Sequence, residues 1–449
     1  MKTFIFLFLS LLIIVLFSGC KKDENESTLY LNKSNIEFGY DEISAIVYIS
    51  NTGSKEFEWT VNSSDDFIMF SKNTGTCSKN SPDNFEIFIN RENLARDSIS
   101  TSISVSTSTG ESRQISLFIL NFPENKIRLD YQVRDAKYDY ANDRLIILSY
   151  ASNIQFVDIY NFTDNSFNSI KLNYDADKIS VSPDGKYAVT ASDYNQQISN
   201  IDLINLKLED EYNISTNVND IVTTSDKTAY IFPKYVYNTI GQLSLTTGNY
   251  LTYDFNQIGY TIVAELHPSG KYIYALDDSY DRFFKLRIDS GSPLLMYNIN
   301  SYLGEKIWIS KDGNYIFTEN KDILHIAPEM AGEDIIETGE FNFSQNYLYY
   351  IDQNITHNEF YVIPSNYDHS YNGSMNSNIN VYNNDFSYTK SIPLEKFYFV
   401  QPGHTEYSLV DPSAEYVFTN SDENKIIVIT KANINYSTAW GIEIIQIDN

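Results

Sequence analysis

The sequence predicts an all-β protein in which an N-terminal β-sandwich is followed by a seven-bladed β-propeller. Three observations support this fold class. The chain of 449 residues contains 36 Tyr and 27 Phe, and aromatic residues favour the pleated, half-buried surface of a strand. From residue 27 onward, short alternating segments are separated by turn residues, and no long segment has helical periodicity. Most of the chain also repeats a strand-turn-strand pattern at intervals of roughly 42 residues.

The first 19 residues have the pattern of a secretory signal peptide. Lys2 gives a positive start, an apolar run continues to Phe17, and the small residues Ser18 and Gly19 precede Cys20. The run is shorter than the ~20 residues that span a bilayer. This ending resembles the lipobox of bacterial lipoproteins, which implies that Cys20 becomes the lipidated N-terminus, although Phe17 departs from the usual residues of that motif.

Residues 20–26 are predicted to be an acidic tether between the lipid and the first domain. Within it, Lys22, Asp23 and Glu24 resemble the surface-export signal of Bacteroidetes lipoproteins. The resemblance implies an outer-membrane protein that faces the cell exterior and contacts the membrane through its lipid anchor only. The alternative is a solvated linker without a sorting role.

The charge balance and the cysteine count limit the partners and the covalent structure. The chain has 32 Lys+Arg against 59 Asp+Glu, a net charge of −27. This balance excludes nucleic acid as a partner, because nucleic-acid binding needs a basic surface. Cys77 is the only cysteine besides Cys20, so no intramolecular disulfide can form after lipidation. We expect Cys77 to be a small buried or half-buried side chain.

The first domain is predicted to span residues 27–122 as a β-sandwich, because seven or so short strands within roughly 100 residues are typical of that architecture. Trp59 alternates with Phe57 and Val61, so we expect it to be a core aromatic residue rather than a sugar-binding platform. The predicted strands are Leu29–Leu31, Asn35–Gly39, Ala45–Ile49, Phe57–Val61, Asn84–Ile89, Ile99–Val105 and Arg113–Leu120, with turns at Asn51-Thr52-Gly53, Asn73-Thr74-Gly75 and Ser108-Thr109-Gly110.

The order of these segments resembles the BACON domain, an immunoglobulin-like module of Bacteroidetes proteins. The resemblance rests on Ile36–Gly39, Trp59–Val61, Asn73–Thr76 and the strand from Asn84 to Asn90, while Arg96-Asp97 stand where the family usually has Gly. It implies a sandwich fold. It also implies either carbohydrate binding or a spacer that lifts the next domain off the membrane.

Residues 127–449 are predicted to form the propeller. Four segments align as a strand, a tight polar turn and a second strand, and three weaker copies complete the seven repeats. Pro presets φ at such a turn, and Gly accepts positive φ. A ring closes best with strands from both ends of the domain, so we expect Ile127–Val133 beside Ile442–Ile447. The predicted turn centres are Asp143, Asp184, Asp226, Gly270, Asp312, Gln345 and Ala414.

This repeat resembles the WD-like and YVTN-type propellers. The resemblance implies the fold and no particular ligand. The alternative for the same strands is a pair of packed β-sandwiches.

The sequence contains no recognisable catalytic, cofactor-binding or metal-binding motif. The five His form no His-x-His or His-x-x-x-His pair, so a zinc site is unsupported and no cofactor is predicted. His267 is expected to be structural, and Asp277, Asp278 and Asp281 are expected to form a solvated loop rather than a calcium site. Two function classes remain. One is a non-enzymatic surface lipoprotein that binds a glycan or a partner protein; the alternative is a propeller-type polysaccharide hydrolase or lyase.

The ligand site is predicted on the face of the propeller opposite the tight turns. The loops between the second and third strands lie there, and we expect an insertion from Asp352 to Ser377 to join them. Tyr suits a sugar ring because it has a flat apolar face and a polar tip, although Tyr is also abundant elsewhere in this chain. The predicted ligand-binding residues are Tyr194, Tyr235, Tyr237, Tyr280, His357, Tyr367, His369 and Tyr371.

Overall fold

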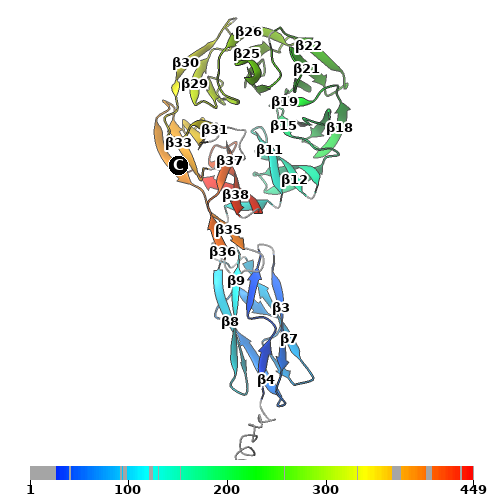
Figure 1. Ribbon diagram of the computed structural model, residues 1–449, viewed down its shortest axis with the longest axis vertical. Coiled ribbons are helices and arrows are strands. Elements are labelled where there is room, and N and C mark those ends of the chain that lie inside the picture. The colour runs from blue at the N-terminus through cyan, green and yellow to red at the C-terminus, as the bar shows by residue number, and fades with distance from the viewer. Residues whose placement is uncertain are drawn as a thin grey trace, which may run out of the picture. The chain divides into compact units, whose positions relative to one another are not determined.

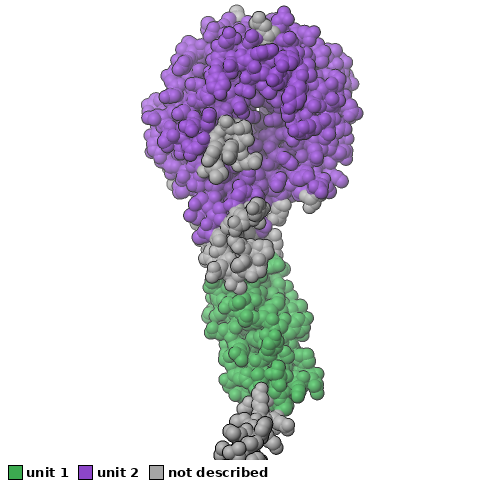
Figure 2. All heavy atoms as spheres, in the orientation of Figure 1, with its two compact units in different colours: residues 1–124, 400–408 green, residues 125–399, 409–449 purple. Residues whose placement is uncertain are grey.

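The computed structural model describes residues 27–39, 42–91, 94, 99–120, 125–129, 131–151, 153–256, 258–330, 332–366, 376–400, 407–434 and 437–447. These residues form β-strands and connecting turns, with no α-helix among them (Figure 1), so the predicted all-β class is confirmed. The chain divides into two compact units, coloured separately in Figure 2. One consists of residues 1–124 with 400–408, and the other of residues 125–399 with 409–449.

The first unit contains two β-sheets. In spatial order, one sheet consists of β1 (Leu29–Leu31), β3 (Ser44–Asn51), β7 (Asp83–Ile89) and β5 (Ile68–Phe70); the other consists of β2 (Asn35–Phe38), β9 (Ser112–Ile119), β8 (Ile99–Thr107), β4 (Phe57–Asn62) and β6 (Thr74–Cys77).

One hydrophobic core receives side chains from both of these sheets. Alternate residues of β3 and β4 point into it, because neighbouring side chains of a strand face opposite sides. Trp59 is 1% exposed and packs against Phe85, with ring centroids 5.5 Å apart. Trp59 is therefore a core residue, as predicted, and Cys77 is buried as predicted.

The seven strands predicted for this unit are present, and two further short strands were missed. The predicted turn at Asn73-Thr74-Gly75 is wrong, because Thr74 and Gly75 lie in β6, which pairs with β4. Gly75 lies opposite Trp59, and a Cβ on Gly75 would approach the indole ring to 2.7 Å. Glycine is required here by close packing inside a sheet, which local sequence cannot distinguish from a turn.

The second unit contains seven four-stranded sheets, which follow one another around a ring in Figure 1. In chain order they are β11 (Gln132–Asp139), β12 (Arg144–Ala151), β13 (Ile154–Asn161) and β14 (Ser166–Lys171); β15 (Lys178–Val181), β16 (Tyr187–Ala191), β17 (Gln197–Asp202) and β18 (Lys207–Asn213); β19 (Val218–Thr223), β20 (Thr228–Pro233), β21 (Thr239–Ser244) and β22 (Tyr250–Asp254); β23 (Ile262–Leu266), β24 (Tyr272–Asp277), β25 (Arg282–Arg287) and β26 (Leu294–Asn300); β27 (Ile307–Ile309), β28 (Tyr315–Thr318), β29 (Asp322–Ile326) and β30 (Ile335–Glu340); β31 (Tyr347–Asn354), β32 (Glu359–Ser365), β33 (Asn378–Asn383) and β34 (Tyr388–Pro393); and β37 (Ser413–Thr419), β38 (Lys425–Ile434), β39 (Ser437–Gln446) and β10 (Lys126–Leu129). A short pair, β35 (Phe397–Val400) and β36 (Tyr407–Val410), forms a separate two-stranded sheet.

Five of the predicted repeat copies form the expected hairpins between the first and second strands of a sheet. The turn glycines adopt positive φ, as the turn chemistry requires: 64° at Gly185, 70° at Gly270 and 72° at Gly313. His267, predicted to be structural, is buried beside such a turn, and its Nε2 lies 3.0 Å from the Gly313 carbonyl oxygen.

In the other two predicted copies, the predicted turn lies one strand too early in the chain. The copy centred on Gln345 joins β30, the last strand of one sheet, to β31, the first strand of the next. The copy centred on Ala414 contains β37, which is again a first strand. The actual first turns of these sheets are residues 355–358 and 420–424. The error arises because these two segments also have apolar residues on both sides of a polar stretch, and that pattern does not tell which strands of a sheet it contains.

The last sheet combines strands from both ends of the second unit. β10 pairs with β39, with Ile127 opposite Ile442. The expected pairing of these segments is confirmed, but the predicted segment to Val133 is too long, because Val133 belongs to β11 in the next sheet. Seven hydrophobic clusters lie between neighbouring sheets, and one of them joins the last sheet to the first. Each sheet thus buries its faces against its neighbours.

Candidate functional site

The strand order defines two faces of the second unit. Each sheet is antiparallel and its first strand lies nearest the centre, so all turns between first and second strands lie on one face, called here the turn face. The loops between second and third strands, and the connections from one sheet to the next, lie on the opposite face, called here the loop face.

Four predicted site residues are exposed on the loop face. Tyr194 lies between β16 and β17, Tyr235 and Tyr237 lie between β20 and β21, and Tyr280 lies between β24 and β25. Their exposed fractions are 75%, 65%, 50% and 48%, respectively. These loops follow buried second strands of three consecutive sheets, which fixes where each loop begins.

A fifth tyrosine packs against the loop that carries Tyr235 and Tyr237, and Tyr237 in turn contacts Tyr280 of the next loop. The ring of Tyr260 lies 6.2 Å from that of Tyr235 and 4.7 Å from that of Tyr237, and the Tyr237 ring lies 6.1 Å from that of Tyr280. Sequence reasoning missed Tyr260 because it lies in the connection between β22 and β23, outside the repeated loops. We call Tyr194, Tyr235, Tyr237, Tyr260 and Tyr280 together the tyrosine surface.

The backbone under the tyrosine surface is fixed by side-chain hydrogen bonds. Asp277 is fully buried and accepts from the Gly259 N–H at 2.6 Å and from the Ser279 N–H at 3.1 Å. Ser279 Oγ in turn accepts from the Tyr260 N–H at 3.0 Å. The expectation of a solvated loop is therefore wrong for Asp277. A Cβ at Gly259 would collide with the Asp277 and Ser279 side chains, so this close approach requires glycine.

A charged cluster lies at one end of the tyrosine surface. Lys234 Nζ is 2.7 Å from Asp193 Oδ2 and lies 5.2 Å from the ring centroid of Tyr194 and 5.4 Å from that of Tyr235. Burial and, after it, a hydrogen bond with the Asp193 carboxyl raise the pKa of Asp177 to about 6. A proton on Asp177 supplies the donor that buried Asp193 Oδ1 otherwise lacks among the described residues.

His357 does not lie on the loop face, contrary to the prediction. It lies in the turn between β31 and β32, on the turn face, where its N–H donates to Asn354 Oδ1 at 2.9 Å. The predicted insertion was placed too early because Asp352 belongs to the first strand of its sheet, and Tyr361 is a buried residue of β32. Seven other predicted residues lie outside the described residues: Cys20, Lys22, Asp23, Glu24, Tyr367, His369 and Tyr371.

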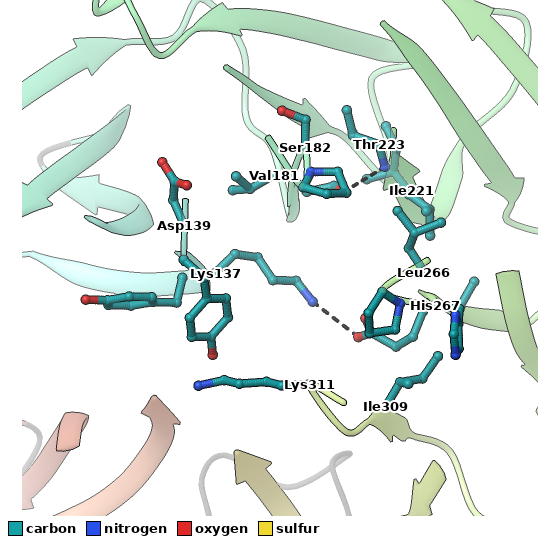
Figure 3. Close-up of a pocket in the computed structure, with 18 of the residues that line it drawn as sticks. Lys137, Asp139, Val181, Ser182, Ile221, Thr223, Leu266, His267, Ile309 and Lys311 are labelled. Atoms are coloured by element: carbon teal, nitrogen blue, oxygen red, sulfur yellow. Dashed lines mark hydrogen bonds and ion pairs between the residues drawn. The ribbon is translucent and has the colours of Figure 1, made fainter. Parts of the chain in front are cut away.

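A cavity of about 470 Å³ opens between the first strands in the turn-face half of the second unit. Figure 3 shows Lys137 extending across it, and its Nζ lies 3.3 Å from Glu265 Oε1 on the opposite wall. The labelled aliphatic side chains Val181, Ile221 and Leu266 line the walls. Sequence reasoning missed the pair because Lys137 and Glu265 lie in different repeats.

Polar groups surround the wide end of this cavity. Lys311 Nζ lies 3.0 Å from Asp352 Oδ2 and 4.0 Å from the ring centroid of Tyr140. The Tyr140 hydroxyl donates to Asp352 Oδ1 at 3.1 Å. Burial, followed by the charge of Asp352, raises the pKa of Tyr140 well above its ordinary value, so Tyr140 is a neutral donor at this position.

A second, smaller cavity of about 140 Å³ lies in the loop-face half of the same centre. Lys137 and Glu265 line both cavities, so their ion pair stands between them. The smaller cavity is lined by further charged and aromatic side chains: Arg134, Asp135, Lys178, Lys306, Trp308, Tyr349, Tyr350, Glu415 and Tyr416.

Within the described part of the chain, no group of three or more His, Cys, Asp or Glu side chains is arranged to hold a metal ion. None of the helices described there is long and apolar enough to cross a membrane.

Comparison with known proteins identifies the fold of the second unit. No family model matches the sequence, and no curated protein matches it. The chain is similar to the crystal structure of the Myceliophteria thermophila Cps50 (Swd1) β-propeller domain, with a TM-score of 0.53 and 11% identity over 72% of this chain and 99% of that one. It also matches Kuenenia stuttgartiensis hydrazine synthase, with a TM-score of 0.47 and 15% identity over 72% of this chain and 97% of that one. The first likeness shows a β-propeller fold and leaves the ligand open.

Proposed function

We propose that this chain is a non-enzymatic binding protein that holds a glycan on the tyrosine surface of its propeller. The observation that carries the proposal is the chain of contacts from Tyr235 through Tyr260 and Tyr237 to Tyr280, with ring centroids 4.7–6.2 Å apart. Tyrosine rings present a flat apolar face to the ring of a sugar, while their hydroxyls and nearby charged groups can bond to its hydroxyl groups.

Two features of the loops support a binding role. The hydrogen bonds of Asp277 and Ser279 fix the backbone, so little conformational entropy is lost when a ligand binds. Tyr235 has a φ of 64°, a left-handed conformation that is strained for a bulky residue. Strain of this kind persists only where the surrounding structure holds the residue in place, and such positions cluster at ligand-binding sites.

We further propose the larger context in which this surface works. The seven four-stranded sheets form a closed seven-bladed ring, and the first unit is an immunoglobulin-like sandwich of the BACON type that acts as a spacer. Lipidated Cys20 anchors the chain in the outer membrane, and Lys22, Asp23 and Glu24 direct it to the cell exterior.

A polysaccharide hydrolase or lyase is the second candidate, and Asp177 is the observation in its favour. Its pKa of about 6 suits a general acid. Its nearest carboxyl partner is Asp193, however, and the two groups share a hydrogen bond. Glycoside hydrolases hold their two carboxyls about 5–9.5 Å apart, so this pair is too close for that chemistry.

The proposal is tested by glycan-array screening of the purified chain, followed by titration of each hit. Replacing Tyr235, Tyr237 and Tyr280 together by Ala should weaken binding at least about 100-fold, because three stacking contacts of roughly 1 kcal/mol each are lost. Thermal unfolding should change little, because these side chains are about half exposed or more. Tyr388→Ala is the matched control, since Tyr388 is 53% exposed on β34 in the same unit.

Retention of glycan affinity by the triple variant would remove the tyrosine surface as the binding site. Release of reducing or unsaturated sugar from a hit would instead favour the enzyme. A third outcome is that the wild type binds no glycan but captures a surface protein, and that the triple variant loses this capture. That outcome would assign the same surface to a protein partner, because tyrosine is also enriched at protein interfaces.

A further inference from the structure

Carboxylates in and near the smaller cavity accept hydrogen bonds from the backbone. Asp135 accepts from the N–H groups of Ala136 and Ile179, each at 2.9 Å. Asp220, on β19 two sheets further along the ring, accepts in the same way from Ile221 and Ala264, each at 2.9 Å. Each of these carboxylates therefore links its own sheet to the next one through hydrogen bonds from the backbone.

The remaining carboxylates of the cavity have partners of their own. Glu415 accepts from the Ser413 hydroxyl at 2.9 Å and from the Tyr349 hydroxyl at 3.0 Å. Glu265 is paired with Lys137. None of these carboxylates forms an ion pair with Lys178 or Lys306, although the charges of Asp220 and Asp135 attract Lys306 from a distance.

Lys178 and Lys306 face this cavity from β15 and from the residue before β27. Neither ammonium group has a hydrogen bond or a carboxylate within 4.0 Å among the residues that the structure describes. The charge of Lys178 is the largest influence on Lys306 and, with burial, lowers the pKa of Lys306. Two like charges thus share a confined space and lack acceptors, an arrangement that an anion would stabilise.

We propose that Lys178 and Lys306 together bind one oxyanion, a carboxylate or a sulfate, carried by an acidic residue of the glycan. This inference rests on the proposed function, because it assigns a chemical class to the ligand of the tyrosine surface. The cavity lies in the half of the centre nearest the loop face, and Trp308, Tyr349 and Tyr350 give it aromatic walls.

Size and charge define the ligand further. A cavity of about 140 Å³ has room for one oxyanion or the acidic end of a sugar. The net charge of −27 repels a densely charged polyanion. The ligand is therefore a glycan with sparse acidic residues rather than a heavily sulfated chain.

The anion site is tested with inorganic sulfate and with glucuronate, using sodium chloride of equal ionic strength as the reference. The Tm of the full chain should rise with the concentration of at least one of these anions, because a ligand that binds the folded state stabilises it. Lys178→Met and Lys306→Met should each weaken the apparent affinity about tenfold or more, because a charge-assisted hydrogen bond is lost. Lys171→Met, on the exposed strand β14, is the matched control and should keep the response.

Without added anion, Lys306→Met should unfold at a temperature equal to or above that of the wild type, because the repulsion from Lys178 is removed. That result would separate a binding defect from a folding defect. A response to sulfate alone would identify a sulfated sugar, and a response to glucuronate alone would identify a uronic acid; either supports the site.

The outcomes distinguish this inference from the proposed function. Unchanged Tm of the wild type in both anions, or equal shifts in the wild type and both lysine variants, would overturn the anion site. If neutral glycans then bind and depend on Tyr235, Tyr237 and Tyr280, the proposed function still stands. If the anion response depends on Lys178 and Lys306 but no glycan binds, the anion site stands and the proposed function fails.

Discussion

Two fully buried charges of opposite sign form a small network in the second unit. Lys285 Nζ lies 2.8 Å from Asp334 Oδ2, and both side chains are fully buried. The Tyr274 hydroxyl donates to Asp334 Oδ2, and the Tyr297 hydroxyl to Asp334 Oδ1, each at 2.6 Å. Burial and these bonds to Asp334 raise the pKa of both tyrosines far above the ordinary value, so they remain neutral donors. The network is satisfied as a whole and therefore depends on every member.

Replacing Asp334 by Ala should lower the free energy of unfolding by about 3–5 kcal/mol, because the Lys285 ammonium would remain buried without its carboxylate. The measurement is denaturant unfolding of the second unit. Glu329→Ala is the control: Glu329 pairs with Lys271 at 3.2 Å on the surface, so its loss should have a small effect. Equal destabilisation by the two variants would contradict a special role for the buried pair.

At the scale of single residues, the sequence predicted burial well where alternation along a strand determines which side chains face the core. Trp59 is an example, since alternation along β4 places it in the core. The ion pair of Lys137 with Glu265, and the facing lysines Lys178 and Lys306, could not be predicted. They meet only because the ring brings the first strands of different repeats together, and nothing in either repeat indicates its partner.

Hairpins were the most predictable elements, because their turns carry their own chemistry. The segment Pro183-Asp184-Gly185 specifies its turn through fixed φ at Pro and positive φ at Gly, wherever it occurs in the sheet. The segments around Gln345 and Ala414 lack this combination of Pro and Gly in the turn. There, the alternating pattern assigned the strands to the wrong positions within their sheets. Turn residues, not strand residues, carry the information about position within a sheet.

The strand β10 closes the last sheet and carries a buried lysine. Lys126 Nζ lies 3.7 Å from Glu443 Oε2 and donates to the Glu395 carbonyl oxygen at 2.6 Å, and its side chain is fully buried. Burial lowers the pKa of Lys126 to about 8, against the opposing attraction of Glu443. The ordinary value of 10.5 applies in the unfolded chain.

This shift predicts a pH dependence for the closure of the ring. Between about pH 8 and pH 10 the unfolded chain binds one proton more than the folded chain at Lys126, so the free energy of unfolding should rise with pH. The contribution is up to about 1.4 kcal/mol per pH unit. Denaturant unfolding at intervals from pH 7.5 to pH 9.5 measures it, and Lys126→Met should flatten the slope. A variant with the slope of the wild type would show that Lys126 is not the group responsible.

At the scale of the whole molecule, the proposed localisation depends on the first residues of the sequence. Cys20→Ser should move the protein from the membrane fraction to the soluble fraction, because the thiol that accepts the lipid is lost. Replacing Lys22, Asp23 and Glu24 together by Ala should keep the protein in the membrane fraction but protect it from protease added to intact cells. A Cys20→Ser protein that stays with the membrane would place the anchor elsewhere.

The overall architecture was predictable because the repeat is long and regular. An all-β chain with a β-propeller second unit follows from the spacing of the turns and from the strand composition. The tyrosine surface was predictable in part, since Tyr194, Tyr235, Tyr237 and Tyr280 lie in equivalent loops. Tyr260 was not, because it lies in a connection between sheets, where the repeat leaves no signal.

The pairing of β10 with β39 also governs how the protein is made. β10 is synthesised before any other strand of the second unit, and its partner is synthesised last. Until then β10 and the growing end of the chain remain unpaired edges, which other chains or chaperones can bind. A nascent chain interrupted before Ser437 lacks the strand that joins them, so it can neither close the ring nor hide those edges from proteases. Synthesis of β39 and acquisition of protease resistance should therefore coincide, and chains that lack β39 should be removed selectively.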